Sequence, residues 1–149
     1  MGRGAASAAA VLLACAACGG GPSSRPPSDR QWVGNARGSL AQLRYDIVLA
    51  AGIDPERAVR EDASIYEALV AFTDFAGCTH MVRAFGDQPA RRAKARAAFD
   101  RACGHLERAA ELFTAAERTS DPGTMRAAIA AAQRAFAPLD DAELALRRE

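Results

Sequence analysis

The chain has 149 residues, of which half are hydrophobic and only 6% aromatic. This length predicts one domain with a core of its own. The formal net charge of +1 argues against binding to nucleic acid through a basic surface. Alanine, the strongest helix former, is abundant and β-branched residues are few, so the composition predicts an all-α protein.

Residues 1–18 read MGRGAASAAAVLLACAAC, in which one cation, Arg3, precedes a short apolar run. The run is too short to span a bilayer, which needs about 20 apolar residues, and its layout is typical of a secretory signal. Leu12-Leu13-Ala14-Cys15 resembles the lipobox of bacterial lipoproteins. The resemblance implies cleavage before Cys15 and lipidation of that cysteine, with an ordinary secretory signal as the alternative interpretation.

Cys18 is a second candidate for lipidation, because it follows Ala16-Ala17 and precedes Gly19-Gly20-Gly21. Cleavage before Cys18 would leave an even pair of cysteines in the body, as an oxidising compartment favours. Cys15 is the first choice because Leu12, three residues earlier, is the aliphatic residue that the lipoprotein family prefers there. The residue after Cys15 is Ala16 and not Asp. By the same resemblance, this implies that the lipidated protein is located in the outer membrane and faces the periplasm.

The resemblance divides the chain into a signal peptide at 1–14, a lipidated cysteine and tether at 15–28, and a helical domain at 29–149. The segment GGGPSSRPPS is dense in Gly, Pro and Ser, and it predicts a disordered tether because it cannot bury apolar surface. Such a tether spans at most about 30 Å. We therefore expect a domain held near a membrane by its N-terminal lipid.

The first expected helix begins with Ser28-Asp29-Arg30-Gln31, which matches a capping box. It ends at Gly52, while Gly34 and Gly38 weaken its first half and leave Ser39 as an alternative start. One face has the three-and-four spacing of a buried helix, through Trp32, Ala36, Leu40, Leu43, Ile47 and Ala50 or Ala51.

A second helix is expected from Asp54-Pro55, an N-cap followed by proline at N1, to Gly86. The short Gly86-Asp87-Gln88 connection predicts that the next helix folds back antiparallel. The apolar positions of the second helix are Val59, Ile65, Tyr66, Leu69, Phe72, Ala76, Met81, Val82 and Phe85.

The third helix is expected from Pro89, and a fourth follows the Asp121 cap and Pro122. Pro138 is expected to kink or end the fourth helix, and the tail after Asp140 to be the least firmly placed part. The third helix carries the apolar stripe Ala95, Phe99, Ala102, Leu106, Ala109, Phe113 and Ala116, and the fourth carries Met125, Ile129, Ala132, Phe136 and Leu139. Four such runs with short connections predict an up-down-up-down four-helix bundle.

Two Cys-x-His units, Cys78-Thr79-His80 and Cys103-Gly104-His105, concentrate the chemistry of the body. In an exported protein we expect a structural disulfide between Cys78 and Cys103, which contributes about 3 kcal/mol. Counted from Asp87, the two cysteines differ by seven residues, or about 10 Å along a helix, whereas a bridge tolerates about 7 Å. The bridge therefore requires the second helix to continue past Gly86 or the third to start after Pro89.

Two other interpretations of these units stay open. Cys78, His80, Cys103 and His105 form a ligand set that zinc accepts, although residues two apart on a helix point away from each other. A haem held by a histidine with Met81 or Met125 is the other, but neither unit is the Cys-x-x-Cys-His attachment motif. We expect no cofactor, and two surface or boundary histidines.

The basic run at the start of the third helix comprises Arg83, Arg91, Arg92, Lys94 and Arg96. Cations at this end oppose the helix dipole, and this conflict indicates a patch for anionic lipid headgroups or an acidic partner. The alternative is a solvated face whose charges are answered by acids such as Asp74, Asp87 and Asp100.

No nucleophile, phosphate-binding or zinc-protease motif is present in the sequence, so we do not expect an enzyme. The sequence favours a lipid-anchored envelope protein with a non-catalytic interaction or structural role, partnered by the membrane and by another envelope protein. The alternative function is a redox, metal- or haem-binding bundle centred on the Cys-x-His units.

Overall fold

A computed structural model describes residues 28–60, 65–87 and 89–147. The predicted signal peptide, both candidate lipidated cysteines and nearly all of the tether lie outside the described residues. Within them every regular element is a helix, which confirms the all-α prediction. The elements are α1 (Asp29–Ala51), α2 (Pro55–Ala58), α3 (Ile65–Ala76), α4 (Cys78–Arg83), the 3-10 turn η2 (Ala90–Arg92), α5 (Ala93–Thr119), α6 (Pro122–Gln133) and α7 (Phe136–Arg147).

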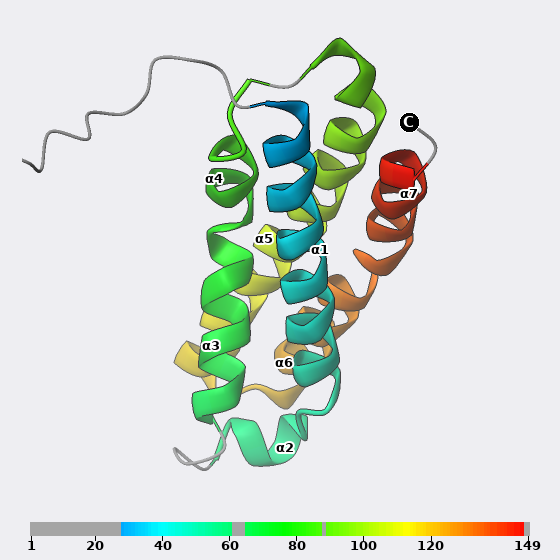
Figure 1. Cartoon of the computed structure of the whole chain (residues 1–149). Helices are drawn as coiled ribbons and strands as arrows, with labels where there is room; N and C mark the ends of the chain where they lie inside the picture. Colours follow the sequence, from blue (N-terminus) through cyan, green and yellow to red (C-terminus); the bar gives the residue numbers. More distant parts are fainter. Residues whose placement is uncertain (1–27, 61–64, 88, 148–149) are drawn as a thin grey trace, which may run out of the picture.

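The helices lie roughly along one long axis (Figure 1). α1 runs from the end where it begins to the opposite end, where α2 crosses, and α3 followed by α4 returns beside α1. α5 is the longest element at 27 residues, and α3, α4, α6 and α7 all pack against it. The core therefore gathers around one face of α5.

α1 begins where the capping box predicts, because the Ser28 hydroxyl accepts a hydrogen bond from the Gln31 N–H at 3.3 Å. The helix runs unbroken through both glycines, so the alternative start at Ser39 is wrong. Packing outweighs the glycine cost: Trp32, two turns upstream of Ser39, is fully buried and meets Phe85 edge to face at 5.7 Å between centroids. The predicted inner face is confirmed for Trp32, Ala36, Leu40, Leu43, Ile47 and Ala50.

The second predicted helix is divided into α2, α3 and α4, so the prediction of one long helix is wrong. Gly77 separates α3 from α4, and its N–H still bonds the Thr73 carbonyl at 3.2 Å. Phe72, Val82 and Phe85 are buried as expected. Leu69, whose side chain is 46% exposed, and Ala76 instead face outward. The predicted burial of the Ile65 and Tyr66 side chains lies outside the description, which gives only the backbone there.

The stripe predicted for the third helix is buried at every position, from Ala95 to Ala116. Its large side chains meet rings from the neighbouring helices. Phe113 stacks on Phe72 at 4.4 Å between centroids, and Phe99 meets Phe85 edge to face at 5.6 Å. The alanines between them let the helices approach closely.

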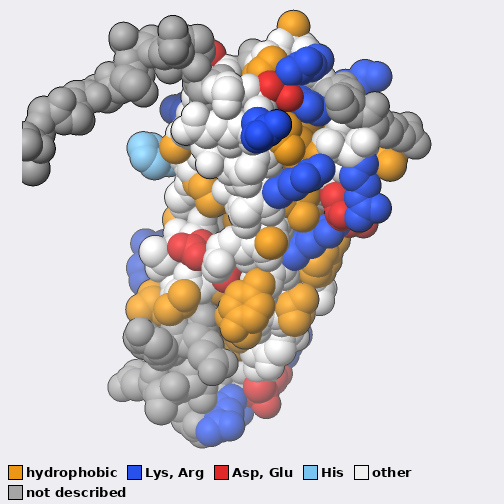
Figure 2. Space-filling view, viewed as in Figure 1, with side chains coloured by type: hydrophobic (Ala, Val, Ile, Leu, Met, Phe, Trp, Pro, Cys, Tyr) orange, Lys and Arg blue, Asp and Glu red, His pale blue; other side chains and the backbone are white. Residues whose placement is uncertain are grey.

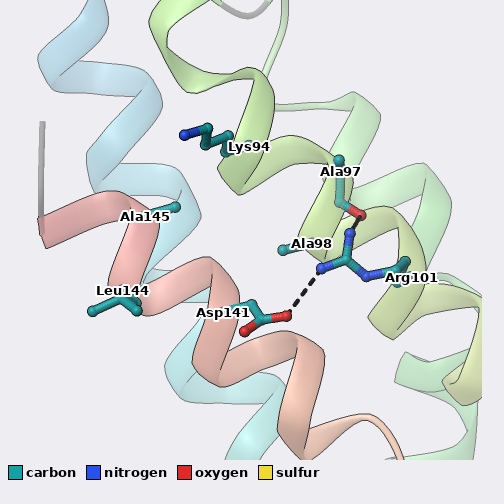
Figure 3. Close-up of a pocket in the computed structure, with 7 residues that line it drawn as sticks. All are labelled: Lys94, Ala97, Ala98, Arg101, Asp141, Leu144 and Ala145. Carbon is teal, nitrogen blue, oxygen red and sulfur yellow. Dashed lines mark hydrogen bonds and ion pairs between the residues drawn. The ribbon is translucent and has the colours of Figure 1, made fainter.

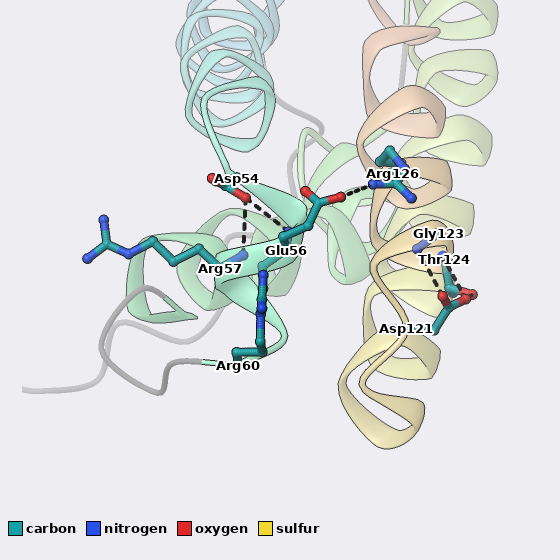
Figure 4. Close-up of polar contacts among 8 residues, drawn as sticks. All are labelled: Asp54, Glu56, Arg57, Arg60, Asp121, Gly123, Thr124 and Arg126. Atoms are coloured by element: carbon teal, nitrogen blue, oxygen red, sulfur yellow. Dashed lines mark hydrogen bonds and ion pairs between the residues drawn. The ribbon is translucent and has the colours of Figure 1, made fainter.

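The aspartates predicted as caps cap their helices at the α2 end of the molecule (Figure 4). The Asp54 carboxylate accepts from the Glu56 and Arg57 N–H groups at 3.0 and 3.1 Å. Asp121 accepts from the backbone of Gly123 and Thr124 and from the Thr124 hydroxyl, and the hydroxyl above all lowers the Asp121 pKa. An ion pair between Glu56 and Arg126 links α2 to α6.

The tail after Asp140 is well packed, contrary to the prediction from sequence. α6 ends at Gln133, and α7 starts at Phe136 with Pro138 in its first turn, where a proline removes no needed hydrogen bond. Leu139, Ala142 and Leu146 of α7 are buried. Two ion pairs from Arg44 of α1, to Asp140 and to Glu143, hold α7 against α1.

We expect Leu146→Ala to lower the free energy of unfolding by about 2–4 kcal/mol, because it leaves a cavity in the core. Leu144→Ala removes the same atoms two residues earlier, where the side chain is 45% exposed, and should cost less than about 1 kcal/mol. Urea unfolding of both variants measures the difference. Equal, small costs would show that α7 is not docked as described.

Candidate functional site

The structure joins Cys78, at the start of α4, to Cys103 in α5 by a disulfide with a Cα–Cα distance of 5.3 Å. Both side chains are fully buried. The expected axial offset is absorbed because α5 starts at Ala93, after the η2 turn, and its first turns extend past the end of α4 (Figure 1). A late start of the third helix is one of the two conditions that the sequence set for a bridge.

The bridge changes what the Cys-x-His units can do. A bridged sulfur is not a thiolate, the form in which cysteine binds a metal. His80 is exposed and His105 half-buried, and in the described ranges no three His, Cys, Asp or Glu side chains gather as metal ligands do. The metal site at Cys78, His80, Cys103 and His105 therefore stays a hypothesis about a reduced chain.

The predicted haem ligands differ in burial: Met125 lies fully inside the core, whereas Met81 is half-buried. A haem held by a histidine with one of these methionines stays a hypothesis.

Three members of the basic run are held in ion pairs. Arg92 is only 4% exposed and binds both carboxylate oxygens of Asp29, at 3.0 and 3.1 Å, and Arg91 lies 2.9 Å from the same carboxylate. Hydrogen bonds from Arg92 and then Arg91 lower the Asp29 pKa to about 2. Arg96 bonds Asp100 at 3.1 Å. The first turn of α1 is thereby fastened to the turn that precedes α5.

The other two members, Arg83 and Lys94, are exposed. Among the described residues neither meets a carboxylate within ion-pair distance. Asp100 pairs with Arg96 of the basic run as predicted. Asp29, about 60 residues earlier in the sequence, pairs with both Arg91 and Arg92 and is the main partner of the run. The run is thus partly a structural network and partly free charge.

Exposed apolar side chains lie on the outer surface of α1 and α3. Tyr45 and Val48 are each 60% exposed, one turn apart on α1, and Leu69 and Val70 on α3 are 46% and 43% exposed. Figure 2 shows hydrophobic side chains on the lower half of this view, over α1 and α3. We call these four residues the α1–α3 face, and its position fits an interaction surface.

A carboxyl pair lies beside this face. Asp46 of α1 is fully buried, and the Gln42 side-chain amide donates to its two oxygens at 3.0 and 3.2 Å. Burial raises the Asp46 pKa to about 6; the Gln42 hydrogen bond opposes this rise, and the charge and hydrogen bond of Asp74 on α3 add to it. Asp46 therefore changes charge near pH 6, and among the described residues no cation forms an ion pair with it.

A groove of about 380 Å³ lies between α5 and α7 (Figure 3). Arg101 spans it, bonding the Ala97 carbonyl at 3.4 Å and the Asp141 carboxylate at 3.0 Å. Its lining is completed by Lys94, Ala98, Leu144 and Ala145. The alanines leave room for a small ligand, and the Arg101 charge is already paired with Asp141.

The chain matches no protein-family model, no curated protein and no solved structure. Among the described helices, none combines the length and the apolar character needed to cross a membrane. The candidate site therefore rests on the geometry of this chain alone.

Sequence reasoning missed Asp46 and its pairing with Asp74. The signal was present, because Asp46 lies three residues after Leu43 and beside Ile47 on the inner side of α1. A carboxylate on a buried helix face is rare without a partner, so the position of Asp46 in the sequence predicts a buried polar contact. The partner on α3 depends on how two helices pack and has no local signature.

We expect the free energy of unfolding to fall by about 3 kcal/mol between about pH 4 and pH 7 because of Asp46. Its folded pKa, about 6, exceeds the ordinary value of 3.8, so the folded state holds the proton more tightly. The stabilisation is present below pH 4 and is lost as the pH rises through 6. Asp46→Asn, which stays neutral, should remove this dependence.

Urea unfolding at several pH values measures the slope, and Asp87→Asn is the matched control because Asp87 is exposed. The control should keep the dependence of the parent. An Asp46→Asn variant with an unchanged slope between pH 4 and 7 would contradict the assignment.

Proposed function

We propose that this chain is a lipid-anchored bacterial envelope protein whose helical domain has a non-catalytic interaction role. The observation that carries the anchor is Leu12-Leu13-Ala14-Cys15 ahead of a Gly/Pro/Ser-rich segment. With it go a signal peptide at 1–14, a tether at 15–28, and an outer-membrane position facing the periplasm. Cys18 is the alternative lipidated residue.

The buried bridge between Cys78 and Cys103 supports export. Disulfides persist in oxidising compartments and are rare in the bacterial cytosol. The bridge fastens the α4 helix to α5. α4 has only 6 residues, and Cys78 and Val82 are its buried ones. A domain that depends on such a bond suits the periplasm.

The finer fold, an up-down-up-down four-helix bundle, is part of this proposal. It treats α3 with α4, and α6 with α7, as two interrupted rods that alternate in direction with α1 and α5 (Figure 1). The interruptions at Gly77 and at residues 134–135 are short. In this arrangement the α1–α3 face lies on one broad side of the bundle.

The interaction role is supported by the α1–α3 face. Tyr45 and Val48 expose more than half of their surface although the core beneath them is closed, and a grouped apolar surface is typical of a protein-binding site. The partner expected is another envelope component. The role is non-catalytic in this proposal because the sequence carries no motif for hydrolysis or phosphate chemistry.

The anchor is tested by growth of the source cells, or of a bacterial host, with an alkyne-bearing fatty acid, followed by detection of labelled protein. We expect label on the parent chain and on Cys18→Ser, and none on Cys15→Ser. Label lost only with Cys18→Ser would move the anchor to Cys18. A parent chain without label would refute the anchor.

The interaction role is tested by photo-crosslinking in cells from a reactive amino acid at Val48. The control places the same group at Glu117, which is exposed on α5. We expect a discrete adduct from position 48 that Tyr45→Lys abolishes, and no such adduct from position 117. The same smear from both positions, or no adduct from position 48, would count against this face.

A further inference from the structure

Three helix ends meet at one end of the molecule: the beginning of α1, the end of α4 and the beginning of α5 (Figure 1). Each brings an exposed cation, namely Arg30 in the first turn of α1, Arg83 at the end of α4 and Lys94 in the first turn of α5. Arg37, also exposed, follows two turns along α1. We call Arg30, Arg37, Arg83 and Lys94 the basic end.

The charges of the basic end are not neutralised. Arg91, Arg92 and Arg96 use the carboxylates of Asp29 and Asp100, so these acids are already occupied. Within residues 28–60, 65–87 and 89–147 the four cations meet no carboxylate, and Asp87 is the one unpaired acid at this end. Figure 2 shows Lys and Arg side chains gathered over the upper part of the view.

The opposite end has a different balance. There Asp54 and Asp121 cap helices and Glu56 pairs with Arg126 (Figure 4). Glu117, near the end of α5, is exposed and has no cationic partner in the part described. Arg60 and Arg118 are exposed cations at this end as well, but there the carboxylates of Asp54, Asp121 and Glu117 offset them. Where α1 begins, four unpaired cations face one unpaired acid, so the molecule is polarised.

We propose that the basic end lies on anionic lipid headgroups and sets the orientation of the domain on its membrane. This inference rests on the proposed lipid anchor, because the anchored segment enters the domain at Ser28, directly before the basic end. The tether from Cys15 to Ser28 spans at most about 45 Å, and its less extended conformations bring these cations to the surface, where the potential of anionic lipids acts within about 10 Å. The α1–α3 face then points sideways and the α2 end points away from the bilayer.

The test uses the mature chain, residues 15–149, with Cys15→Ser and Cys18→Ser, which cannot be lipidated, and with its Cys78–Cys103 bridge formed. Sedimentation at low salt measures its binding to vesicles of phosphatidylethanolamine with phosphatidylglycerol and to vesicles of phosphatidylcholine. We expect binding to the anionic vesicles alone, and its loss at high salt.

Two double variants carry the same loss of charge. Arg83→Gln with Lys94→Gln removes half of the basic end and should weaken binding roughly thirtyfold. Arg118→Gln with Arg134→Gln removes two exposed cations that lie elsewhere and, among the described residues, meet no carboxylate, and it should leave binding nearly unchanged. Circular dichroism confirms that both remain folded.

Equal weakening in both double variants would show attraction by net charge without a surface, and would overturn the proposal. Binding that ignores phosphatidylglycerol would overturn it too, and would point to an acidic protein as the partner of these cations. Because the tested chain has no lipid, its result does not depend on fatty-acid labelling. Failure of the anchor and failure of the basic end are therefore distinguishable.

Discussion

The burial of one face of α5 is the constraint on which the rest of the structure depends. Large residues such as Phe99 and Leu106 alternate there with alanines, and α3, α4, α6 and α7 pack on it. Two further links tie neighbouring elements to α5 and to the turn before it. The disulfide holds α4 on α5, and the pairing of Asp29 with Arg92 holds the start of α1 beside the turn before α5.

Periodicity and capping chemistry were enough to predict much of this fold. The stripes of α1 and α5 and the Asp54 and Asp121 caps are local patterns, and all are confirmed. The division of the second helix at Gly77 and the restart of the chain before Pro138 were not predicted, because neighbouring helices decide them. Leu69 shows the limit of periodicity: it continues an apolar stripe in sequence, but nothing packs over it, and it stays 46% exposed.

The candidate site was less predictable than the fold. The disulfide between Cys78 and Cys103 was predicted from the expected oxidising compartment and from the even number of cysteines in the body. The structure shows the late start of α5 that brings the two cysteines together. Asp46 with Asp74, and Asp29 with the basic run, join residues far apart in the sequence. What remains unpaired after folding, the α1–α3 face and the basic end, is what we propose the protein uses: one surface for a partner, the other for the membrane that its anchor brings close.

The most direct measurement is mass spectrometry of the protein extracted from its native membrane and alkylated without reductant. We expect Cys78 and Cys103 to escape alkylation and to become reactive only after reduction, because they are bridged in an oxidising compartment. We also expect the N-terminal cysteine to carry lipid. Alkylation of both body cysteines before reduction, in a protein without lipid, would contradict the exported, anchored and bridged domain described above.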